Sequence, residues 1–191
     1  MTTLVNSNTA GTDIRGDLLT DRGGPSTRLR VDSAQTSFFA GREARTFYDI
    51  SLATATSVVI KAVVPVDIIL NKLDVLINTE EILVETVVGG SEGGTFSTAL
   101  PIFPANTMAE RPLPLYTFLT TLNAGGTHTG GTLLDIIRLK TGGATQQAIS
   151  VGSSPFDERG VSANTYYFRL TNLGNGTLVG VFKARWEERL P

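Results

Sequence analysis

The chain has 191 residues, a formal net charge of −2, 18% charged residues and no cysteine. Its length fits one domain, or one domain with an arm, and allows a sizeable buried core. The near-neutral charge gives no basic field for nucleic acid or an anionic membrane, and the lack of cysteine excludes disulfides, thiolate metal sites and cysteine nucleophiles. The first residues contain neither the basic nor the apolar part of a signal peptide, and no apolar run reaches the roughly 20 residues of a membrane helix. We therefore expect a soluble protein made in a cytoplasm, with neither nucleic acid nor a membrane as partner.

Residues 1–45 are predicted to form an extended N-terminal arm. They are polar, rich in Thr, Ser, Gly, Asp and Arg, and their apolar residues come in ones and twos, such as Phe38 and Phe39. Such a segment cannot bury enough apolar surface to offset its ordering entropy by itself. We expect the arm to pack on a neighbouring subunit, with Phe38 and Phe39 as contact residues. The alternative is a surface strap that lies on its own domain.

Residues 46–191 are predicted to form one domain, an antiparallel β-sandwich or jelly roll of about eight strands. Short runs rich in β-branched and aromatic residues are separated by Gly, Pro, Asn and Thr, and no window carries a helical stripe. The fold class is therefore all-β. The predicted strands are 57–64, 68–77, 82–88, 115–122, 132–140, 146–151, 165–172 and 178–187.

The last two of these strands are predicted to form a hairpin. Asn175-Gly176 lies between them, and this dipeptide accepts the positive φ angles that tight hairpin turns require. Both flanks are rich in Tyr, Phe, Val and Trp, which suit a pleated, half-buried surface.

Three connections are long or dense in glycine and proline, namely 88–116, 125–132 and 153–164. Long ordered connections of this kind tend to be contact loops. The first contains Phe96, Phe103, Met108 and Tyr116, and the second contains His128. We predict these five residues, with the arm phenylalanines, as interface residues.

Catalytic and metal-binding motifs are weak. His128 is the sole histidine, and one His without Cys cannot supply the ligands of a structural zinc site. The glycine loops lack the following helix and the Lys of a phosphate-binding loop, and Gly89-Gly-Ser-Glu-Gly93 lacks the helix that a nucleophile elbow needs. His128 is therefore interpreted as a turn residue or as a contact to a neighbour.

Acidic doublets occur at 80–81, 157–158 and 187–188. Neighbouring residues of a strand point to opposite faces, so a doublet does not by itself give the facing carboxylates of a glycosidase. Loop carboxylates also suit calcium, but no EF-hand or nonapeptide signature is present. We expect no enzyme activity, no metal and no cofactor.

The aromatic residues allow two interpretations. Alternation pairs Tyr166 with Phe168, and Phe182 with Trp186, along strand faces, as in an ordinary core. The alternative is a sugar-stacking platform built from Trp186, Tyr166, Tyr167 and Phe182. An exposed Trp or Tyr in a groove beside loop carboxylates would favour the second interpretation.

Several motifs in a fixed order resemble one protein family. They are Val87-Val-Gly-Gly-Ser-Glu-Gly-Gly-Thr-Phe, Gly125-Gly-Thr-His-Thr-Gly-Gly-Thr, Asp157-Glu-Arg-Gly, Asn164-Thr-Tyr-Tyr-Phe-Arg-Leu-Thr-Asn-Leu-Gly-Asn-Gly-Thr and Ala184-Arg-Trp-Glu-Glu. Over about residues 47–188 the chain resembles a group of small virion structural proteins of tailed bacteriophages. The resemblance implies a β-sandwich displayed on the virion, often as a homotrimer, with the major capsid protein or tail proteins as partners.

Within that resemblance we expect a capsid decoration or cement protein that binds and stabilises the assembled shell. The arm would drape over capsid subunits, and the sandwiches would meet around a threefold axis through the proline-rich loop 96–118. Assembly would take place in the host cytoplasm. The alternatives are a tail-fibre or tail-adaptor component, whose arm docks to the tail, and a glycan-binding β-sandwich module.

Overall fold

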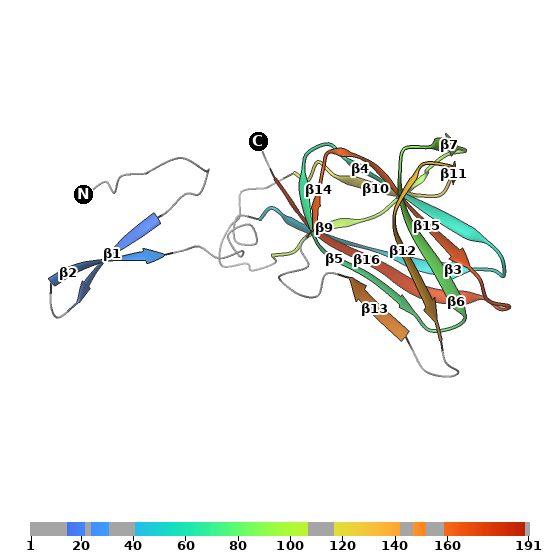
Figure 1. Cartoon of the computed structure of the whole chain (residues 1–191), viewed down its shortest axis with the longest axis horizontal. Helices are drawn as coiled ribbons and strands as arrows, with labels where there is room; N and C mark the ends of the chain where they lie inside the picture. Colours follow the sequence, from blue (N-terminus) through green and yellow to red (C-terminus); the bar gives the residue numbers. More distant parts are fainter. Residues whose placement is uncertain are drawn as a thin grey trace.

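The computed structural model describes residues 15–21, 24–30, 41–106, 117–141, 147–151 and 159–189 (Figure 1). Every strand pair in these ranges is antiparallel and none of these residues is helical, so the predicted all-β, antiparallel fold is confirmed. The two large sheets are consistent with a β-sandwich, and jelly-roll connectivity stays a prediction. The described part of the chain has no helix that is long and apolar enough to cross a bilayer.

Two large sheets, here named sheet I and sheet II, make up the body. Sheet I has the order β12 (Thr132–Lys140), β6 (Glu81–Val88), β15 (Asn164–Asn172), β4 (Ser57–Val64), β10 (Thr121–Ala124) and β8 (Thr98–Ala99). Sheet II has the order β13 (Gln147–Val151), β5 (Ile68–Ile77), β16 (Leu178–Glu188), β3 (Glu43–Leu52) and β9 (Ile102–Pro104), and β14 (Arg159–Val161) also pairs with β5.

Two small ribbons complete the described strands. One pairs β7 (Ser91–Gly93) with β11 (Thr127–Thr129), and the two lie side by side at one end of the body (Figure 1). The other pairs β1 (Arg15–Asp21) with β2 (Gly24–Arg30) inside the predicted arm, and neither strand pairs with any other described strand. The sequence did not predict this hairpin, because its apolar residues show no sustained period. The division into an arm and a domain at residue 45 stays a prediction, and β3 begins at Glu43.

Most predicted strands agree with the structure. The runs 57–64, 68–77 and 132–140 are confirmed as β4, β5 and β12. The runs 82–88, 146–151, 165–172 and 178–187 match β6, β13, β15 and β16 to about one residue. The run 115–122 is wrong in position, because residues 117–120 are not in a strand and β10 begins at Thr121. The longest unpredicted strand is β3.

The core lies between the inner faces of the two sheets. Alternate residues of β15 and β16 point inward, among them Tyr166, Phe168, Phe182 and Trp186. The rings of Phe168 and Phe182, one from each sheet, have centroids 5.3 Å apart. Full burial of a large apolar side chain stabilises a fold by about 1.5–3 kcal/mol. The ordinary-core interpretation of these aromatic residues is confirmed, and Trp186 is only 2% exposed.

The predicted hairpin between the last two long strands is wrong. β15 lies in sheet I and β16 in sheet II, so residues 173–177 cross from one sheet to the other. Neither Asn175 nor Gly176 has a positive φ angle. Asn172, 1% exposed, holds the crossing: its Nδ2 donates to the carbonyls of Leu52, Ala53 and Gly176, and its Oδ1 accepts from the Gly174 amide.

The carboxylate of Glu80 explains why residues 174 and 176 of this crossing are glycines. A second crossing between the sheets joins β5 to β6 and contains Glu80, whose φ angle is +66°. Its carboxylate lies against Gly174 and Gly176. A Cβ at either glycine would collide with that carboxylate. Glu80 Oε2 accepts from the Asn175 amide at 3.0 Å. The two glycines therefore leave the space that the Glu80 side chain occupies. This contact holds the two crossings together at one end of the sandwich.

Candidate functional site

The predicted interface residues fall into two groups. Phe38, Phe39, Met108 and Tyr116 lie outside the described residues. Phe96 is half-buried, Phe103 is 42% exposed, and His128 is only 6% exposed. The structure brings Phe96 and His128 into one cluster and places Phe103 on the other sheet.

The first cluster covers one end of the outer face of sheet I. The His128 ring stacks on the Tyr167 ring with centroids 3.8 Å apart and planes 16° apart. His128 Nε2 lies 2.7 Å from the carbonyl oxygen of Gly89. Because a carbonyl only accepts, Nε2 carries the proton and donates. Gly90, with φ +96°, leaves the space that the ring needs, since a Cβ there would lie 2.7 Å from Nε2.

A carboxylate joins this cluster to the sheet. Tyr167 Oη donates to Glu92 Oε1 at 2.5 Å, and Lys61 Nζ lies 2.8 Å from Glu92 Oε2. Burial and the neighbouring Glu92 carboxylate raise the pKa of Tyr167 to about 12. Hydrogen bonds from Lys61 and then from Tyr167 lower the pKa of Glu92. The cluster thus keeps the neutral phenol of Tyr167 hydrogen-bonded to the ionised carboxylate of Glu92. This contact joins the loops to the sheet, and a neutral phenol is not an activated nucleophile.

The two acidic doublets within the described residues, at 80–81 and 187–188, are each split between separate contacts. Glu80 faces the 173–177 crossing, whereas Glu81 pairs with Arg138 and, at 3.4 Å, with Lys140. The fully buried Glu188 accepts from the backbone amides of Leu119 and Thr120, the shorter contact being 2.7 Å. The doublet at 157–158 lies outside the described residues. The described residues hold no group of three or more His, Cys, Asp or Glu side chains that could bind a metal ion.

A groove on the outer face of sheet II is the most distinctive open surface. It has a volume of about 460 Å³ and is lined by Arg45, Thr46, Phe47, Lys72, Asp74, Phe103, Lys183, Ala184 and Arg185. The rings of Phe47 and Phe103 stack with centroids 6.1 Å apart and planes only 4° apart, although both side chains are more than 40% exposed. This exposed aromatic pair, here named the aromatic wall, lies beside cationic side chains.

Three cations line up across the groove. Arg45 on β3 is directly opposite Arg185 on β16, and Arg185 is directly opposite Lys72 on β5. Residues at opposite positions have Cβ atoms about 4.5–5.5 Å apart, and like charges there destabilise a sheet. In the neighbouring row Lys183 lies between Phe47 and Asp74. The sheet therefore concentrates positive charge on one face of a chain whose net charge is negative.

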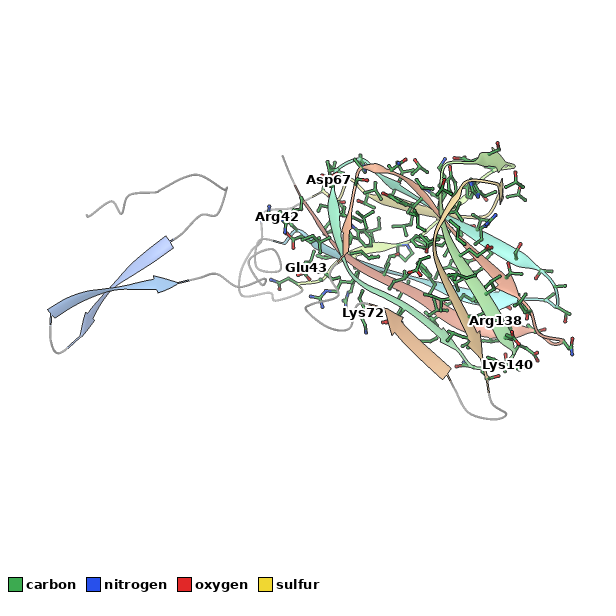
Figure 2. All side chains as sticks on the ribbon, in the orientation of Figure 1. Arg42, Glu43, Asp67, Lys72, Arg138 and Lys140 are labelled. Carbon is green, nitrogen blue, oxygen red and sulfur yellow. The ribbon has the colours of Figure 1, made fainter. Side chains whose placement is uncertain are left out.

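Two of these cations are neutralised by the fold. Lys72 Nζ lies 2.8 Å from Asp74, and Arg185 Nε donates to the buried Glu43 at 2.8 Å. Arg45 and Lys183 have no such partner among the described residues. Figure 2 shows Glu43 and Lys72 toward one end of the body, away from Arg138 and Lys140.

Of the residues that line this groove, only Phe103 was predicted from the sequence as an interface residue. Arg45 was assigned to the arm, and β3, which carries Arg45 and Phe47, was not predicted. A signal was present, because Ala44, Thr46, Ile50 and Leu52 alternate inward along β3.

A second open surface lies on the edge strand β12. Leu133, Leu134 and Ile136 are all exposed there, and β12 ends sheet I. A β-bulge at Leu134 interrupts the pairing with β6. Leu134 also lines a cavity beside Phe168 and Trp186 between the two sheets, so these exposed side chains do not all lie on one face. Exposed apolar side chains at a sheet edge are candidates for protein contacts.

Comparison with known proteins gives no family. No family model and no curated protein matches the chain. Among solved structures it is similar to the VP2 protein of infectious bursal disease virus. A mutant VP2 in T=1 particles has 14% identity and a TM-score of 0.16, and covers 97% of this chain and 48% of that one. A VP2 subviral particle has 13% identity and a TM-score of 0.16, with 93% and 47% covered. This chain spans about half the length of either, and similarity at such TM-scores assigns neither fold nor function.

Proposed function

We propose that this chain is a structural protein of a tailed-phage virion, specifically a capsid decoration or cement protein. It binds the assembled shell as a trimer, with the major capsid protein as partner. Binding the shell, and not its separate subunits, stabilises the shell by mass action. The proposal assigns the protein no enzymatic activity.

The observation that carries this proposal is the exposed apolar edge of sheet I. Leu133, Leu134 and Ile136 are exposed on the edge strand β12, and exposed apolar side chains at such an edge are suited to contact with another protein. The β1–β2 hairpin, which pairs with no other described strand, adds a second element suited to contact with a neighbour. The family resemblance of the loop and strand motifs points to a virion as the place where such contacts are made.

The first experiment measures the copy number and position of the chain in purified particles, by quantitative mass spectrometry and imaging. Many copies spread over the shell are expected. A few copies at one vertex would instead favour a tail-fibre or tail-adaptor component. Absence from particles would refute a virion role.

The second experiment removes the N-terminal arm and measures occupancy on particles. The deletion should end at residue 40, because β3 begins at Glu43 and Ala44 is fully buried. The shortened chain should keep its thermal unfolding transition and lose binding to particles. Unchanged occupancy would contradict the role of the arm.

The third experiment tests the edge strand with a matched pair of variants. Ile136→Asp places a charge on the exposed edge of β12, and Val179→Asp places one at an exposed site on β16. We expect only Ile136→Asp to lower the trimer population in analytical ultracentrifugation, or the occupancy on particles. Equal effects of the two variants would remove β12 from the contact.

A further inference from the structure

We propose that the groove on sheet II binds an acidic sugar, that is, a pyranose that carries a carboxylate. This inference is independent of the virion role and rests on the side chains that line the groove. Its elements are an aromatic wall, a row of cations and a volume suited to a small ligand.

The excess of positive charge in the groove favours an anionic ligand. Arg45, Arg185 and Lys72 occupy directly opposite positions on three neighbouring strands, an arrangement that destabilises a sheet. Asp74 and Glu43 offset Lys72 and Arg185. Arg45 has no ion-pair partner among the described residues, and Lys183 is directly opposite Asp74 without an ion pair to it. A bound carboxylate between Arg45 and Lys183 would offset the charge of Arg45, and arginine presents paired donors that match a carboxylate.

The exposed pair of Phe47 and Phe103 favours a ligand that also has an apolar face. Arg45 is directly opposite Phe103, and Lys183 is directly opposite Phe47, so each uncompensated cation adjoins one ring. The planes of the two rings are nearly parallel, at 4°, and both residues stay more than 40% exposed. A pyranose ring has the required flat face, and its carboxylate then lies within reach of the cations.

The size and position of the groove favour a small ligand over a polymer held by its backbone. Its volume of about 460 Å³ falls within the roughly 300–1,000 Å³ of small-molecule sites. The groove lies on the face of sheet II, whereas an added peptide strand would pair with a sheet edge. Two uncompensated cations are too few for the several phosphate contacts that nucleic-acid binding needs.

The test is titration calorimetry of the full chain with a galacturonate trisaccharide as the probe. A neutral galactose trisaccharide and inorganic phosphate serve as comparison ligands. We expect binding of the acidic trisaccharide in the millimolar range or tighter, clearly stronger than binding of either comparison ligand. Failure of the acidic probe to bind at millimolar concentration would overturn the proposal. Equal affinity for the neutral trisaccharide, or for phosphate, would overturn it as well.

Variants assign the binding to this groove. Arg45→Ser and Lys183→Ser each remove one surface charge and should weaken binding by up to about fivefold. Phe103→Ser removes part of the wall and should weaken binding by about tenfold. Lys140→Ser is the matched control, because it removes an exposed cation at the far end of sheet I. Loss of binding in the control, or unchanged binding in the groove variants, would place the ligand elsewhere.

Discussion

Tyr167 offers the sharpest quantitative test of the loop cluster. Its phenol donates to Glu92 at 2.5 Å, beneath the His128 ring, and its pKa is raised from 10.0 to about 12. The raised pKa means that folding favours the neutral phenol. Stability from this effect is therefore fully present below pH 10 and is lost as the pH rises from about 10 through about 12.

The size of the effect follows from that shift. Each pH unit corresponds to about 1.4 kcal/mol, so a shift of about two units gives about 3 kcal/mol. The Glu92 side chain is 38% exposed, and solvent screens part of its interaction with the phenol. We expect the wild-type protein to lose about 2 kcal/mol through Tyr167 between pH 10 and pH 12.

The assay is urea unfolding at fixed pH values from 9 to about 11.5, for the wild type and Tyr167→Phe. At pH 9 the variant should be less stable by about 1–2 kcal/mol, because it loses a hydrogen bond to a charged acceptor. As the pH rises to about 11.5, the difference between the two free energies of unfolding should shrink by about 1–2 kcal/mol. The control Tyr48→Phe keeps Tyr167, so its free energy of unfolding should fall with rising pH as that of the wild type does. Parallel curves for the wild type and Tyr167→Phe would refute the reasoning.

Three further predictions concern the two sheets. Gly180→Ala should cost about 2–3 kcal/mol in urea unfolding, because a Cβ there would collide with the backbone carbonyl of Leu76 on β5. Asn172→Ala should cost about 2–4 kcal/mol in the same assay, since it leaves buried carbonyls of the crossing without a donor. Arg45→Gln should raise the melting temperature at low salt and leave it unchanged in 1 M salt, because it breaks the row of like charges with Arg185. A lower melting temperature for Arg45→Gln at low salt would contradict the repulsion.

The strands that the sequence predicted well are those whose signal is local. The run 57–64 is β-branched and stops at Pro65, and 132–140 lies between glycines and a polar loop. Such segments carry both their pattern and their ends in neighbouring residues. β3 was missed because three of its four outward positions, Arg45, Asp49 and Ser51, are polar and because it follows a polar segment without a break.

The wrong hairpin shows where local reasoning fails. Asn175-Gly176 is a turn signal, but it does not specify which strands the flanking segments pair with. Here the partners are set by Asn172, which binds carbonyls of the loop after β3, and by Glu80, which fills the space left by the glycines. Both contacts join residues distant in sequence. The same limit hid the stacking of His128 on Tyr167, which only the fold brings together.

Glu80 and the cations on sheet II each break a local rule, and they differ in what compensates them. Glu80 has a positive φ angle, and the fold repays that strain with a hydrogen bond from Asn175 and the close fit against two glycines. The four cations of the groove on sheet II are only partly compensated, because Asp74 and Glu43 pair with Lys72 and Arg185 while Arg45 and Lys183 have no ion pair among the described residues. Sequences that fold well satisfy such rules except where function needs otherwise. A repulsion left standing beside an exposed aromatic wall is thus best explained by an anionic ligand that the groove binds.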